Sequence, residues 1–155
     1  MALTHSSVFS DRRNYIPNNN LETFGGCVLS IIITDMTHEK FGDELTRELY
    51  EQIHTNLCGN HRICQFANML KLKDLIYSGK PSLNVKEMAN IFLALLTAIV
   101  VDSGWCVAVD FVEKLVGPIM DNLVNNGKFV GIQINDKLFM NEKIPIKNVI
   151  KLGPN

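Results

Sequence analysis

Apolar residues recur at spacings of three and four along most of the chain before residue 125, which is the period of amphipathic helices. This pattern predicts helices at about 19–36, 43–57, 61–72, 85–101 and 105–124, and the end of another helix within 1–10. The helix at 85–101 is apolar on all sides, so we expect it to be the buried centre of a bundle.

A different pattern follows the last helix. Residues 128–134 and 137–140 alternate or run apolar around Asn135 and Asp136, which is typical of a small β-hairpin. The chain is therefore predicted to be all-α, a bundle of about six or seven helices with a short C-terminal hairpin. Residues 1–124 would form the helical domain, and residues 125–155 a C-terminal extension.

The first long helix contains an adjacent glycine pair, Gly25 and Gly26, in its second turn. Each glycine costs a helix roughly 1 kcal/mol relative to alanine. Such a cost suggests that a packed helix or a nucleic-acid chain approaches the backbone closely there. In the same helix Glu22 has a structural interpretation: with Asn19 as the N-cap, it occupies the third helical position and completes a capping box.

Composition indicates one globular domain. The 155 residues are 46% hydrophobic and carry a formal net charge of −1, and the sequence pI is near 6.4. There is thus no general attraction to phosphates, and we expect non-specific RNA affinity to be weak. The most apolar run, 91–101, is too short for the ~20 residues of a membrane span, so no membrane contact is predicted.

Four cysteines lie mostly within apolar helical patterns, where a free thiol behaves as a small buried hydrophobe: Cys27, Cys58, Cys64 and Cys106. This usage fits a reducing compartment. Two of them flank His61 at the spacing of a zinc-site fragment, but a structural zinc site needs a second pair of ligands. Packing is the favoured interpretation.

Four short motifs occur in one order along the chain: ALTHSS at 2–7, LETFGGCVL at 21–29, an Asn-to-Gly segment at 60–79, and AIVVDSG at 98–104. Together they resemble the ribonuclease III family over about residues 2–124. The resemblance implies a helical, dimer-forming nuclease fold whose members cut double-stranded RNA with Mg²⁺. It also begins at residue 2, where the family's first helix would already be under way, which is compatible with an N-terminal part that carried a transit peptide.

The resemblance breaks down at the acidic site. The family holds Mg²⁺ with four acids, two on each signature helix, because hydrolysis of a phosphodiester by water needs divalent metal on hard carboxylate oxygens. Those four positions fall on Glu22, Gly26, Asn90 and Leu93, of which only the first is an acid. One carboxylate and one amide make a poor magnesium site, so we expect no catalytic residue, metal or other cofactor, with Glu22 in a capping role.

The resemblance suggests a contact with a protein partner, and the charge pattern suggests contacts with RNA. The family dimerises through its signature helices, which points to an interface centred near Phe24 and Val28, in a homodimer or with another ribonuclease III-like chain. Candidate RNA contacts are the basic residues that precede the first signature helix or flank the segment before the second: Arg12, Arg13, Lys71, Lys73 and Lys80. Solvation is the alternative interpretation of these charges.

Three functions remain open. The first is a catalytically inactive domain that acts as a dimerising RNA or protein scaffold, in an organellar ribonucleoprotein such as the mitochondrial large ribosomal subunit, where similar family members occur. The second is a double-stranded-RNA endonuclease that completes its Mg²⁺ site with acids from a partner subunit. The third is a protein-interaction module without RNA contact, which the net charge favours. A double-stranded-RNA-binding domain, if needed, is expected from another chain because 125–155 is too short.

Overall fold

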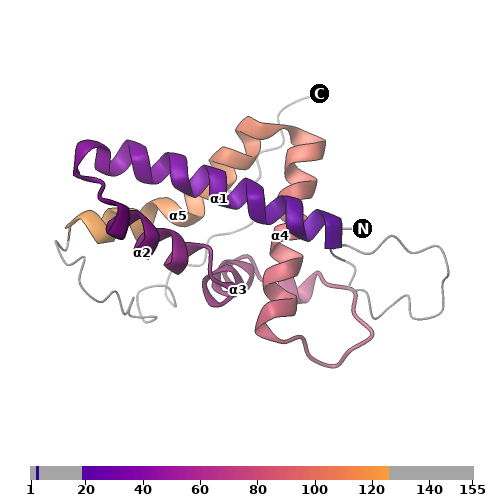
Figure 1. The fold of residues 1–155 in the computed structure, drawn as a ribbon. Coiled ribbons are helices and arrows are strands. Elements are labelled where there is room, and N and C mark those ends of the chain that lie inside the picture. Colours follow the sequence, from indigo (N-terminus) through magenta and orange to yellow (C-terminus); the bar gives the residue numbers. More distant parts are fainter. Residues whose placement is uncertain (1–2, 4–18, 126–155) are drawn as a thin grey trace.

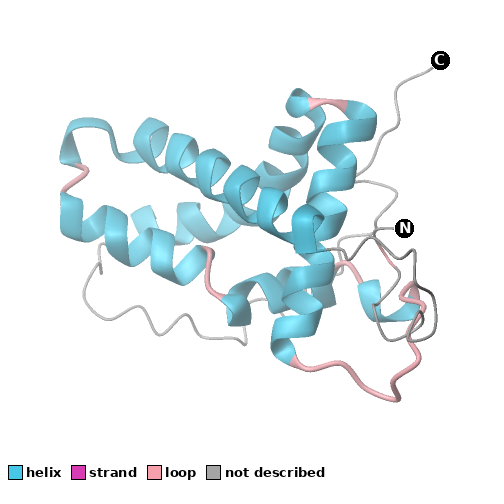
Figure 2. Ribbon diagram, turned by 45° about the vertical axis from the view of Figure 1, so that its right-hand side comes forward, coloured by secondary structure: helices cyan, strands magenta, loops and turns pink. Residues whose placement is uncertain are grey.

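The computed structural model describes residue 3 and residues 19–125 of the chain. Within this part there is no β-strand, which confirms the all-α class. Its α-helices are α1 (Asn19–Phe41), α2 (Arg47–Leu57), α3 (Asn60–Met69), α4 (Val85–Ser103) and α5 (Trp105–Asn125), with 3-10 turns at Gly42–Glu44 and Leu72–Asp74 (Figures 1 and 2). The predicted hairpin at 128–140 lies outside the described residues, as does nearly all of 1–10.

Helix α4 is the centre of the bundle, as its apolar sequence predicts. It packs against α1, α3 and α5 (Figure 1). The ring of Phe92 lies between two other aromatic rings, with centroids 5.8 Å from that of Phe66 on α3 and 6.0 Å from that of Phe111 on α5. Because all three side chains are almost fully buried, this column joins three helices through one continuous core.

The two largest differences from the predicted helix boundaries are at the end of α1 and the start of α2, and α3 also ends three residues early, at Met69. Helix α1 continues to Phe41 instead of ending near residue 36, because Thr37 and Phe41 are buried and the polar residues between them occupy the exposed face of the same helix. It ends where Gly42 takes a positive φ of 47°. Helix α2 begins at Arg47 instead of residue 43, with the Thr46 side chain accepting a hydrogen bond from the Leu49 amide at 3.2 Å.

Candidate functional site at the crossing of α1 and α4

Helices α1 and α4 cross with their backbones in direct contact near the N-terminal end of α1 (Figures 1 and 2). A Cβ atom built on Gly25 would lie 2.0 Å from the Leu93 carbonyl oxygen and 2.6 Å from its carbon. No side chain fits between the two helices at that distance, so only glycine permits the crossing. The predicted close approach at Gly25 is confirmed, and the approaching chain is a helix.

The second glycine does not have this role. A Cβ atom built on Gly26 would have only Leu93 Cδ1 nearby, at 3.9 Å, which is an ordinary van der Waals contact. The expectation of a close backbone approach is therefore wrong for Gly26. One turn of α1 contains both a position that excludes side chains and a position that accepts them.

A buried threonine ties the crossing together. Thr97 on α4 is 2% exposed, and its hydroxyl donates to the Leu21 carbonyl of α1 at 2.5 Å, with the Leu93 carbonyl at 3.2 Å. The sequence offered a signal for this contact, since Thr97 is the one polar residue in the apolar run 91–101. We did not predict it, because a threonine in a helix often bonds only its own preceding turn.

The crossing brings together all four positions that the sequence resemblance assigns to the family's acids. Glu22 Oε2 accepts a hydrogen bond from Asn90 Nδ2 at 2.8 Å, and the Leu93 side chain lies beside Gly26. The orientation of the amide follows from chemistry, because an ionised carboxylate only accepts hydrogen bonds. All four residues are half-buried. An inter-helix contact of Glu22 was not predicted from the sequence.

This set of side chains does not fit a magnesium ion. Mg²⁺ takes hard oxygen ligands in near-octahedral order, and here Gly26 offers no side chain, Leu93 is apolar, and the Asn90 amide directs a donor group at the one carboxylate. Elsewhere in the described part of the chain, no cluster of three or more His, Cys, Asp or Glu residues has the geometry to hold a metal.

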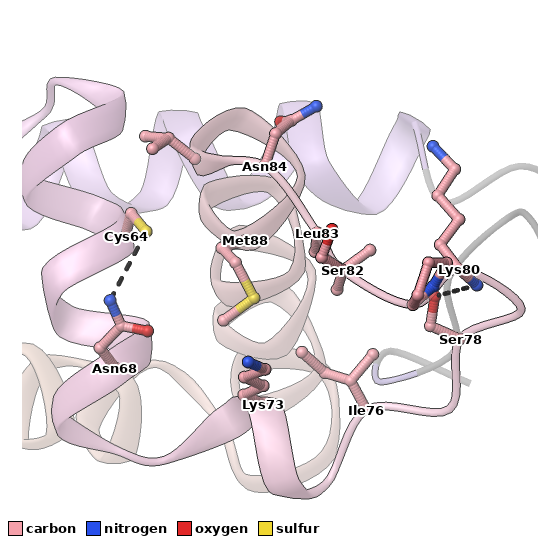
Figure 3. A pocket seen from close by; sticks show the side chains of 12 residues that line it. Cys64, Asn68, Lys73, Ile76, Ser78, Lys80, Ser82, Leu83, Asn84 and Met88 are labelled. Carbon is pink, nitrogen blue, oxygen red and sulfur yellow. Dashed lines mark hydrogen bonds between the residues drawn. The ribbon is translucent and has the colours of Figure 1, made fainter.

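Two of the predicted RNA-contact lysines line one cavity of about 320 Å³ between α3, the segment 76–83 and the start of α4 (Figure 3). Lys80 forms an ion pair with Glu87, whose side chain also closes a capping box with Asn84 at the start of α4. Lys73 faces the same cavity. Lys71 is exposed outside it, and Arg12 and Arg13 lie outside the described residues.

The outer face of α1 carries apolar residues that the bundle leaves uncovered. Phe24 is 49% exposed and Ile31 is 56% exposed, with exposed Cys27 between them at helical spacing. We call these three residues the α1 stripe. Val28, the other predicted interface residue, is 2% exposed and packs in the core of the single chain. It lies one helical turn beyond Phe24 on nearly the same face. Its burial therefore comes from the packing of the other helices and marks the inner edge of the exposed face.

The cysteines and His61 belong to no metal-binding cluster within the described residues. Cys58 is half-buried beside His54, with Sγ 3.5 Å from Nε2, and burial raises the pKa of its thiol to about 11. A thiol of that pKa is a poor nucleophile and a poor metal ligand at neutral pH. His61 is exposed. The prediction of buried thiols is wrong for Cys27 and Cys106, both of which are exposed.

No helix in the described residues is long and apolar enough to cross a membrane.

Comparisons with known proteins agree with the fold. Residues 1–119 match the model of a family described as ribonuclease-III-like. The protein named Ribonuclease 3 of Desulforamulus reducens is 30% identical over 79% of this chain and 53% of its own length. Ribonuclease 3 of Francisella tularensis subsp. holarctica is 26% identical over 97% of this chain and 63% of its own. The chain thus spans only part of these relatives.

A solved structure has the same fold. It is the nuclease domain of ribonuclease III from Campylobacter jejuni, described as having structural flexibility in a region involved in dimer formation. The two chains superpose with a TM-score of 0.64 over 76% of this chain and 82% of that one, at 22% sequence identity.

Proposed function

The chain belongs to the ribonuclease III-like family, and from that membership we propose that it is a catalytically inactive member that acts as a dimerising scaffold for RNA or protein. The observation that carries the proposal is the composition of the α1–α4 crossing. Glycine, asparagine and leucine occupy three of the four positions of the family's acids, and the fourth, Glu22, accepts a hydrogen bond from Asn90. The fold of the nuclease is retained without its ligand set.

Inactivity follows from the chemistry of phosphodiester hydrolysis. A metal-dependent nuclease needs cations that activate water and neutralise charge on the attacking and leaving oxygens. Glu22 alone offers two ligand oxygens, of which one is engaged by the Asn90 amide at 2.8 Å. No residue of the crossing supplies an alternative base beside it, because Gly26 and Leu93 cannot transfer protons.

The α1 stripe supports the dimerising part of the proposal. Phe24 and Ile31 are large apolar side chains that stay about half exposed on one face of a helix, where an apolar surface of a partner would cover them. The related nuclease domain of Campylobacter jejuni is described with a region involved in dimer formation. We propose that a second ribonuclease III-like chain, a copy or a relative, covers this face.

RNA contact would be local and weak. Acidic residues outnumber basic ones in residues 19–125, so the bundle as a whole repels phosphates. Lys71 and Lys73 are the exposed cations of the predicted set that form no ion pair within the described residues, whereas Lys80 is held by Glu87. We propose these two as RNA contacts. The proposed setting, an organellar ribonucleoprotein such as the mitochondrial large ribosomal subunit, rests on the resemblance to inactive family members alone.

We predict that the purified chain does not cut double-stranded RNA in Mg²⁺ or Mn²⁺. The measurement is gel electrophoresis of an end-labelled RNA duplex after long incubation at excess protein, with an active ribonuclease III as the positive control. Glu22→Ala, purified in the same way, separates intrinsic activity from contamination, because a contaminant's cleavage would be the same in both preparations. Cleavage that the parent shows and Glu22→Ala loses would overturn the proposal.

The same assay addresses the endonuclease alternative. If the chain contributed half of a shared metal site, cleavage would appear only after a second ribonuclease III-like subunit is added, and it would depend on Glu22. We expect no gain over the partner's own activity, because a partner cannot replace the three missing carboxylates at positions already filled by Gly26, Asn90 and Leu93.

A further inference from the structure

The hydrogen bond between Glu22 and Asn90 lies where this chain's residues do not fit a metal, at the positions that the resemblance assigns to the family's ligand set. It joins two helices that touch through their backbones. Its donor and acceptor come from α1 and α4 and are 2.8 Å apart. Beside it, Gly25 contacts the Leu93 carbonyl, and the Thr97 hydroxyl bonds the Leu21 carbonyl. All three contacts lie within two turns of each helix.

Charge explains why a donor is needed here. A cluster of carboxylates at a helix crossing is held together by its cation, and it repels itself when the cation is absent. An amide on the facing helix removes the need for a cation. Glu22 then faces a hydrogen-bond donor instead of a second negative charge. The contact then needs no ion.

We propose that Asn90 is a positioning residue that takes the place of a divalent cation at the α1–α4 crossing. Its amide holds the Glu22 carboxylate, fixes α1 on α4 without metal, and so keeps the α1 stripe in one orientation. Glu22 is retained as the acceptor of this contact and not as a remnant ligand. The inference concerns folding of the chain alone, so it stands or falls separately from the proposed scaffold function.

The test compares melting temperatures in EDTA and in millimolar Mg²⁺ or Mn²⁺ for four chains: the parent, Asn90→Asp, Glu22→Gln, and the double variant that combines both substitutions. We expect the parent to melt at the same temperature in all buffers. Asn90→Asp replaces one amide by a carboxylate of the same shape and so places two carboxylates face to face. In EDTA this variant should melt roughly 5–10 °C below the parent, which is the size expected for loss of a charge-assisted hydrogen bond. Divalent cations should recover part of that loss.

The double variant is the matched control. Its new amide at position 22 donates to its new carboxylate at position 90, which restores a bond of reversed polarity between side chains of the same lengths. We expect its melting temperature in EDTA to return close to the parent's and to show no response to cations. Glu22→Gln alone keeps an acceptor for the Asn90 amide, so it should melt within a few degrees of the parent.

Three results would overturn the inference. The first is an Asn90→Asp chain as stable in EDTA as the parent, since the contact would then position nothing. The second is a double variant that melts as low as Asn90→Asp, since position 90 would then act through something other than Glu22. A parent chain stabilised by Mg²⁺ would contradict it too, whereas RNA cleavage by the parent without cation-dependent melting would overturn only the scaffold proposal.

Discussion

Gly25→Ala should lower the free energy of unfolding by about 3 kcal/mol, because it adds a methyl group where α1 has no room for one. The new Cβ atom would be 2.0 Å from the Leu93 carbonyl oxygen, and that neighbour is backbone, which cannot rotate away as a side chain would. The helices must separate, which also lengthens the Thr97–Leu21 hydrogen bond. Alanine returns up to ~1 kcal/mol through helix propensity, which does not offset the clash.

The neighbouring glycine provides the control. Gly26→Ala adds the same methyl group one residue later, where Leu93 Cδ1 at 3.9 Å leaves room for it. Because there is no clash, the higher helix propensity of alanine is not offset, and we expect this variant to be more stable than the parent by up to ~1 kcal/mol. Urea denaturation followed by circular dichroism measures both free energies of unfolding. Equal changes at the two positions would contradict the crossing geometry.

The fold was predictable because helical periodicity is strong within each helix of this chain. Residues such as Phe92 and Leu96 recur at spacings that place them on the inner faces, and both are buried as expected. The boundary errors arose where polar residues follow an apolar run. Residues 38–40 look like a loop in the sequence, yet they are the exposed face of a helix whose other face is fixed by Phe41. Periodicity alone does not distinguish these cases.

The site was predictable only in part. Position-by-position comparison with the family indicated which acids are missing, but it treated Glu22 as a capping residue or an isolated ligand. Its contact with Asn90 joins positions 68 residues apart, and no local pattern encodes such a pair. The same holds for Val28: helix geometry places it one turn from Phe24 on nearly the same face, and only the packing of the other helices leaves Phe24 half exposed while Val28 is buried.

Phe24→Asp should abolish self-association through the α1 stripe. In a two-fold symmetric dimer the substitution acts twice, and removing a central aromatic anchor costs at least about 2 kcal/mol each time, so the dissociation constant should rise several hundredfold or more. Placing a carboxylate in the apolar contact adds a desolvation cost. Because Phe24 is 49% exposed, the isolated chain should keep its fold. Sedimentation equilibrium across a concentration series measures the change.

Tyr77→Asp is the matched control, since Tyr77 is 69% exposed and lies outside α1, in the segment between α3 and α4. It introduces the same charge at an exposed aromatic residue, so a general effect of added negative charge on association would appear in both variants. We expect the Tyr77→Asp chain to associate like the parent. If it dissociates as readily as Phe24→Asp, the stripe is not the interface. If the parent stays monomeric at every concentration and does not bind a ribonuclease III-like partner, the dimer proposal fails, because two half-exposed apolar side chains on one helix would then be covered by nothing.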